Sequence, residues 1–139
     1  MVVIVVGLVW TVAADGLQPW LQRLRQLRLE QALAAVRAAD TLHHARCLQQ
    51  GARGCRVVLA DGRPVADAFG HPAASEDGIV RAANLGELGV QWRPSLRHAL
   101  PVLTIQVPTP SGEGCDFTYV QASVSGAQPG IDEYRASCR

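Results

Sequence analysis

The chain has 139 residues, with 13 basic against 12 acidic side chains and a formal net charge of +1 at pH 7. This length allows one domain with a small core. The near-neutral charge argues against nucleic acid as a partner, because binding phosphates needs a basic surface. An even number of cysteines, four, indicates two disulfides and a place outside the cytoplasm.

An uncharged apolar run, residues 2–14, opens the chain and is expected to be helical. Thirteen residues at about 1.5 Å each cover roughly 20 Å, whereas the hydrocarbon core of a bilayer is roughly 30 Å thick. As written, the run cannot span a membrane. Two alternatives stay open: it is the end of a longer membrane segment, or it is a secretory signal peptide cleaved near Ala14. The signal peptide is disfavoured because no basic residue precedes the run.

The sequence then predicts one long helix that reaches Gln50, with a break at Asp15-Gly16 and Pro19. At the helical period it carries two apolar stripes on roughly opposite sides. The first stripe comprises Leu17, Trp20, Leu21, Leu24, Leu27, Ala35, Ala38, Leu42 and Ala45, and the second comprises Leu29, Leu33 and Val36. Two stripes predict two partners, namely the head of this chain and neighbouring subunits. Burial of the whole helix in its own domain explains such a pattern equally often.

Residues 51–139 are predicted to form a globular head. Gly51 and Gly54 are expected to end the helix, and short extended segments are expected at Arg56–Ala60 and Val65–Phe69. Ser75 is expected to cap a short helix that continues to Asn84 and is closed by Gly86. The segment Leu88–Trp92 is either a strand or a covering segment.

The two clearest strands are the alternating, β-branched segments Pro101–Val107 and Cys115–Val120, with residues 108–114 as the loop between them. A polar stretch then leads to Cys138. We therefore predict an α+β fold in which the long helix packs on an antiparallel sheet of about four strands. The strand core is expected to include Val57, Leu59, Leu103, Ile105, Phe117 and Tyr119.

One set of side chains could hold zinc: Asp40, His43 and Cys47 lie on one helix face, with His44 adjacent. Against this, Cys55 lies eight residues after Cys47 across a glycine-containing turn, which favours a Cys47–Cys55 disulfide. His71 and His98 lie in loops without a companion catalytic motif. We therefore expect no metal, no cofactor and no enzymatic activity.

Four segments carry a resemblance to a known family: the Val-Val-Ile-Val start of a long helix, Leu42 to Gly51, the Gly-His-Pro-Ala-Ala segment that follows Phe69, and the terminal loop from Cys115 to Cys138. Together they resemble bacterial type IV pilins and pseudopilins, most closely the mannose-sensitive-haemagglutinin-like pilins. The resemblance covers nearly the whole chain. It implies a pilin-like fold and a disulfide between Cys115 and Cys138.

The resemblance further implies a structural subunit of a type IV pilus or related secretion filament, held in the bacterial inner membrane and then polymerised into an extracellular pilus or a periplasmic pseudopilus. Residues 1–27 would be the membrane and filament-core part, and residues 28–50 the amphipathic part. The residues expected in the assembly helix are Val2, Val3, Ile4, Val5, Val6, Leu8, Val9, Trp10, Leu17, Leu21 and Leu24.

The implied partners are copies of this chain, other pilins, inner-membrane lipid and, where an upstream leader exists, a prepilin peptidase. The alternative is a monomeric, exported, disulfide-stabilised binding or enzymatic domain.

Two features depart from the family. Its leader and its Gly-Phe-Thr-Leu-Ile-Glu motif do not precede Met1, so the chain as written is expected to fail at processing and assembly. Its helix-kinking proline is displaced by about one turn to Pro19.

Overall fold

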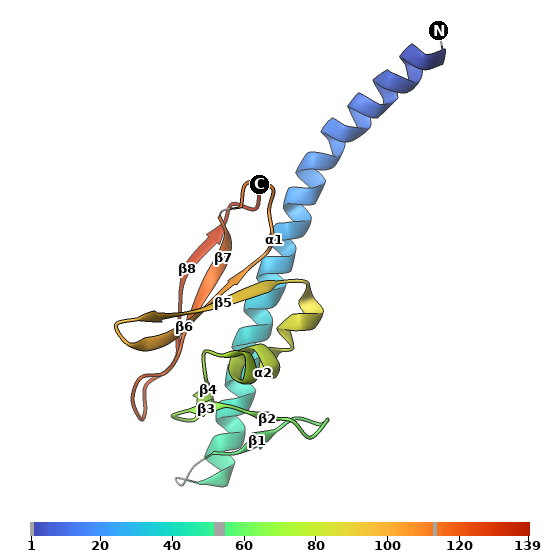
Figure 1. The fold of residues 1–139 in the computed structure, drawn as a ribbon. Helices are drawn as coiled ribbons and strands as arrows, with labels where there is room; N and C mark the ends of the chain where they lie inside the picture. Colours follow the sequence, from blue (N-terminus) through green and yellow to red (C-terminus); the bar gives the residue numbers. More distant parts are fainter. Residues whose placement is uncertain (1, 52–54, 113) are drawn as a thin grey trace.

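The computed structural model describes residues 2–51, 55–112 and 114–139, with the side chains of the first helix described from Pro19 onward. The fold is α+β: a long helix, α1 (Val2–Gln50), packs on a four-stranded antiparallel sheet (Figure 1). The N-terminal part of α1 extends well beyond the head, and the helix changes direction before it meets the head (Figure 1).

The predicted break in this helix is wrong, because Pro19 lies inside a continuous α1. Proline lacks an N–H and its ring crowds the carbonyl four residues earlier, here that of Asp15. This removes one hydrogen bond and bends a helix without having to end it. At the other end α1 stops at Gln50, and Gly51 takes a left-handed φ of 86° as expected of a terminating glycine. Gly54 lies outside the described residues.

The sheet has the strand order β5-β6-β7-β8, with all neighbours antiparallel. Its strands are β5 (Gln91–Arg97), β6 (Leu100–Gln106), β7 (Cys115–Val120) and β8 (Gly130–Ala136). The two central strands confirm the two clearest sequence predictions, and the loop between them also lies where it was expected. The start of β5 overlaps Leu88–Trp92, for which a strand was one of two expectations, whereas β8 was missed. Because β5 contains Pro94 and the middle of β8 is exposed and polar, neither shows the pattern of a buried strand.

The two extended segments predicted before residue 70 do not join this sheet. They form separate two-stranded ribbons, in which β1 (Val57–Val58) pairs with β2 (Pro64–Val65), and β3 (Asp67–Ala68) pairs with β4 (His71–Pro72). Phe69 has a φ of 56°, so the chain turns at the residue where the prediction continued a strand. The predicted number of strands in the main sheet is therefore right, but two of its members are different.

The helix predicted after Ser75 is present only as three short, irregular turns: η1 (Glu76–Val80), α2 (Arg81–Ala83) and η2 (Leu85–Leu88). Ser75 makes no capping bond, because its hydroxyl instead lies 2.6 Å from Asp77 Oδ1. Asn84, with a left-handed φ of 53°, ends α2 in place of the predicted Gly86. Ser75 therefore occupies the predicted N-cap position without the capping bond, and α2 ends at Asn84 as predicted, but Gly86 does not close it.

The core lies between α1, the short helical turns and the inner face of the sheet. Leu103 faces Tyr119 and Ile105 faces Phe117 across β6 and β7, and all four side chains are fully buried. Of the predicted core, Val57 is also buried, whereas Leu59 is only half-buried. Alternation along the two central strands places these side chains on one face, towards α1.

Candidate functional site

The side of α1 that contacts the head carries the second predicted stripe. Leu29 and Val36 are completely buried, together with Ala32 between them, and Leu33 packs partly against the same core. One predicted stripe therefore packs on the head, and the structure shows that it is this one. Residues three, four and seven apart share one face of a helix, so the spacing alone placed these side chains together.

The opposite side of α1 carries apolar side chains that the head does not cover. Trp20 is 63% exposed, and Leu27 and Leu42 are each 54% exposed. These residues recur at helical spacing with one further leucine and two exposed alanines. Together they form the outer face of α1: Trp20, Leu24, Leu27, Ala38, Leu42 and Ala45. Both predicted stripes are therefore present, and burial of the whole helix in its own domain does not occur.

Of the residues expected in the assembly helix, Leu21 and Leu24 are exposed on α1. Val2 to Trp10 and Leu17 belong to the same helix, in the part that extends beyond the head, and their side chains lie outside the described part of the structure. Within that described part, no helix meets both the length and the apolar character needed to cross a membrane.

Two disulfides join the pairs expected from the sequence, Cys47 with Cys55 and Cys115 with Cys138. The second pair holds the C-terminal segment against the start of β7. Arg25 also reaches this segment, since its Nη1 lies 3.4 Å from the carbonyl oxygen of Cys138. The C-terminal loop is therefore held both to the sheet and to α1, at the point where α1 leaves the head (Figure 1).

A cluster of histidine and aspartate side chains lies where α1 meets the β3–β4 ribbon. His43 Nε2 is 2.7 Å from Asp67 Oδ1, and His71 Nδ1 is 2.7 Å from Asp40 Oδ1. The rings of His44 and His71 stack with their centroids 4.2 Å apart and their planes within 6°. His44 Nδ1 also lies 3.1 Å from the carbonyl oxygen of Gly70.

This arrangement corrects the set of metal ligands considered from the sequence. Asp40 pairs with His71 and not with His43, and Cys47 is bonded to Cys55. The sequence showed the i, i+3, i+7 spacing on the helix but not that a ribbon 20 to 30 residues later supplies the partners. His98, in contrast, lies exposed in the turn between β5 and β6.

Tyr119 connects the same region to the sheet. It is completely buried, and its hydroxyl donates a 2.7 Å hydrogen bond to the carbonyl oxygen of Pro72. Burial raises the pKa of Tyr119 far above its usual range, and the negative charges of Asp40 and Asp67 raise this pKa further. The phenol is therefore a neutral hydrogen-bond donor that joins β7 to β4.

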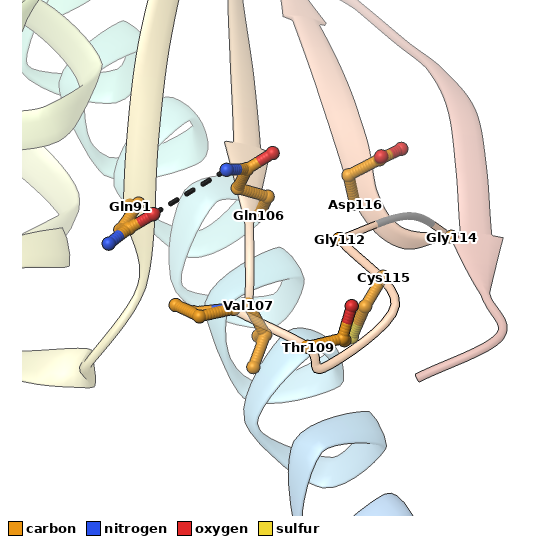
Figure 2. A pocket seen from close by; sticks show the side chains of 9 residues that line it. Gln91, Gln106, Val107, Thr109, Gly112, Gly114, Cys115 and Asp116 are labelled. Atoms are coloured by element: carbon orange, nitrogen blue, oxygen red, sulfur yellow. Dashed lines mark hydrogen bonds between the residues drawn. The ribbon is translucent and has the colours of Figure 1, made fainter. Parts of the chain in front are cut away.

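A pocket of about 200 Å³ lies between the ends of β5, β6 and β7 (Figure 2). Gln91, Gln106, Thr109 and Asp116 supply its polar side chains, and Gln106 Nε2 lies 3.5 Å from Gln91 Oε1. Burial raises the pKa of Asp116. The lining residues that the structure describes include no histidine and no free thiol.

No protein-family model, curated protein or solved structure matches this chain. The fold and the surfaces described above are therefore the basis for a functional proposal.

Proposed function

We propose that this chain is a structural subunit of a bacterial filament of the type IV pilus or pseudopilus class, and that it polymerises through α1. The proposal combines the pilin resemblance of the sequence with an α+β fold in which a long N-terminal helix packs on an antiparallel sheet. It assigns the chain no reaction. The observation that carries it is the outer face of α1, which continues towards the extended N-terminal part of the helix.

The outer face favours other copies of the same helix as its partner. Complete burial of a leucine or tryptophan side chain contributes about 1.5–3 kcal/mol. Because these side chains are about half exposed in the monomer, packing against a neighbouring helix would bury the remaining half of several at once. A helix that is apolar on both sides is typical of one that packs between two partners.

Packing of this kind would produce an open-ended array of subunits and not a closed ring. The head and the free N-terminal part of α1 lie at different ends of the molecule (Figure 1), so a contact between the outer face of one copy and the extended helix of the next is heterologous. Heterologous contacts that do not close into a ring produce fibres. The Cys47–Cys55 disulfide and the Arg25 contact support this role, because they hold the head to α1.

Before assembly, we place the subunit pool at the bacterial inner membrane, with the apolar start of α1 in contact with lipid, and the filament outside the cytoplasm. The partners are then copies of this chain, other pilins and a prepilin peptidase acting on a leader. This part of the proposal rests on the resemblance and on the apolar run at residues 2–14.

The test uses the chain with a family leader added, expressed in a pilus-competent host, with sheared filaments examined by immunoblot and electron microscopy. We expect the chain to enter filaments. We expect the double variant Trp20→Asp with Leu24→Asp to fold but to enter filaments at less than about a tenth of that amount, because about 1.4 kcal/mol of lost contact already gives tenfold.

Val124→Asp is the matched control, because Val124 is a 59% exposed apolar side chain in the loop between β7 and β8. This variant is expected to assemble normally. Normal assembly of the double variant would contradict a role for the outer face. Absence of the unmodified chain from filaments would contradict the filament proposal as a whole.

A further inference from the structure

Four potential metal ligands come together where the C-terminal end of α1 meets the β1 and β3 ribbons. They are His43 and Cys47 of α1, Cys55 just before β1, and Asp67 of β3, and one donor atom from each lies within 4.8 Å of all the others. Cys47 Sγ is 3.6 Å from Asp67 Oδ1, and His43 Nε2 is 2.7 Å from that same oxygen.

These distances are close to those of a tetrahedral zinc site. Zinc binds sulfur at about 2.3 Å and nitrogen or oxygen at about 2.0–2.2 Å, so its ligands lie roughly 3.3 to 3.8 Å from one another. The four donors therefore need only small side-chain movements, apart from separation of the two sulfurs. Two thiolates, one imidazole and one carboxylate are a donor set that favours zinc over calcium or magnesium.

Neither nitrogen of His43 is engaged outside this cluster. Nε2 faces Asp67, and Nδ1 is buried without a hydrogen-bond partner in the part of the chain that the structure describes. His43 is only 2% exposed, so this arrangement leaves a buried polar atom unsatisfied. A cation bound by Nε2 would replace only its contact with Asp67, which is itself one of the four potential ligands.

We propose that reduction of the Cys47–Cys55 disulfide converts this cluster into a binding site for zinc or another thiophilic divalent cation, with His43, Cys47, Cys55 and Asp67 as ligands. The disulfide and the metal site exclude each other, because a disulfide sulfur has no thiolate to offer. The proposal is independent of the filament function.

The chemistry requires a reductant, which we take to be a dithiol. The dithiol transfers two electrons and two protons to the disulfide, so the S–S bond breaks, two S–H bonds form, and the dithiol becomes a disulfide itself. The cation then displaces one proton from each thiol. Cys55 is half-buried whereas Cys115 and Cys138 are fully buried, so the reductant reaches the Cys47–Cys55 bond more readily.

The test uses the full chain and a phosphine reductant, which does not compete for metal as a dithiol would. Differential alkylation and peptide mapping establish the conditions under which Cys47 and Cys55 are free while Cys115 and Cys138 remain bonded. Under these conditions Co²⁺ is titrated as a spectroscopic probe, followed by its displacement with Zn²⁺. We expect one Co²⁺ per reduced chain, with thiolate-to-cobalt charge transfer and tetrahedral ligand-field bands, and none for the oxidised chain.

His43→Gln and Asp67→Asn are each expected to lower the Co²⁺ affinity of the reduced chain by at least about tenfold, the loss that even supporting residues of metal sites produce. The second histidine–aspartate pair on the same ribbon provides matched controls. His71→Gln and Asp40→Asn remove an equally short contact but no donor of the cluster. The Co²⁺ affinity of these two reduced variants should therefore stay at the wild-type value.

Three results would overturn the proposal: no Co²⁺ binding with both thiols free, equal binding by the oxidised chain, or unchanged affinity in His43→Gln. If reduction alone unfolds the head, Zn²⁺ is expected to restore the circular dichroism of the folded protein, because metal binding is then coupled to folding. Failure of Zn²⁺ to restore that signal would equally count against the site.

Discussion

At the scale of single residues, Tyr119 links the pH dependence of stability to one hydrogen bond. Burial, and then the charges of Asp40 and Asp67, raise the pKa of Tyr119 in the folded protein. A phenol whose pKa is raised on folding contributes stability that is fully present below its unfolded pKa of about 10. That contribution is lost as the pH rises above this value, because only the unfolded chain then releases the proton.

We therefore expect Tyr119→Phe to lower the free energy of unfolding at neutral pH by about 1–3 kcal/mol, since the buried carbonyl of Pro72 loses its donor. The variant should also lose part of the wild-type decrease in stability above pH about 10. Urea unfolding at both pH values measures this. Tyr134→Phe is the control, because Tyr134 is 43% exposed. Equal losses in the two variants would show that the buried hydrogen bond is not the cause.

Gly78 is a second residue at which the addition of one atom, a Cβ, is expected to lower stability. It lies in η1 with a φ of −97° and a ψ of −110°, and a Cβ there would meet the backbone carbonyl of Ala73, with the carbonyl carbon at 2.8 Å. The backbone of Ala73 cannot move aside for the added Cβ as a flexible side chain could. We expect Gly78→Ala to destabilise the head by about 1–3 kcal/mol, the range for overpacking.

Gly86→Ala provides the comparison for Gly78→Ala, because its Cβ would meet only the Trp92 ring edge at 3.9 Å. Its change in melting temperature should be small. If differential scanning calorimetry gave the two alanine variants the same melting temperature, close approach of Ala73 would not explain the glycine at position 78.

At the scale of elements, α1 has two apolar faces with different consequences for stability. Leu29 lies on the face towards the head and is fully buried, whereas Leu27, two residues earlier, lies on the outer face. Because both residues are leucines in the same helix, replacing each in turn separates the contribution of packing from that of helix propensity.

Leu29→Ala should lower the stability of the monomer by about 2–5 kcal/mol, because it removes buried methyl groups and leaves a cavity. Leu27→Ala should change it by less than about 0.5 kcal/mol, as expected for a surface substitution. Denaturant unfolding of the monomeric chain compares the two. A loss for Leu27→Ala as large as that for Leu29→Ala would mean that the head covers both faces.

At the scale of the whole molecule, the Cys115–Cys138 disulfide connects the end of the chain to the core. Its closed loop spans 23 residues and both sulfurs are buried. Chain-entropy estimates assign such a loop about 3 kcal/mol, a large part of the stability of a small domain. Together the disulfide and Arg25 hold the C-terminal segment on two elements.

We expect the Cys115→Ala with Cys138→Ala double variant to lose about 3 kcal/mol or more, because it removes the cross-link and also leaves a space in the core. The double variant Cys47→Ala with Cys55→Ala opens a loop of only eight residues and should lose less. Thermal unfolding of both double variants measures which of them loses more stability. A larger loss at the shorter loop would show that the C-terminal segment contributes little to the core.

The features predicted correctly are those whose signal in the sequence is local and periodic. The apolar period along α1 predicted two stripes, one with Leu29 and Val36 and one with Leu27, although burial in the structure was needed to show which of them faces the head. Alternation predicted the two central strands, because a strand with one buried face must repeat every two residues. The α+β class follows from these elements together.

Features that depend on contacts between distant segments have no local signal, so they could not be predicted. The edge strands β5 and β8 carry no buried period and form because the central strands offer them hydrogen bonds. The ribbon that brings Asp67 to His43 is positioned by its contacts with α1, which no local sequence pattern reveals. A helical spacing can place His43 and Cys47 side by side, but Asp67 lies 20 residues after Cys47 and reaches them only through the fold. The cluster of four donors was therefore visible only in the folded chain.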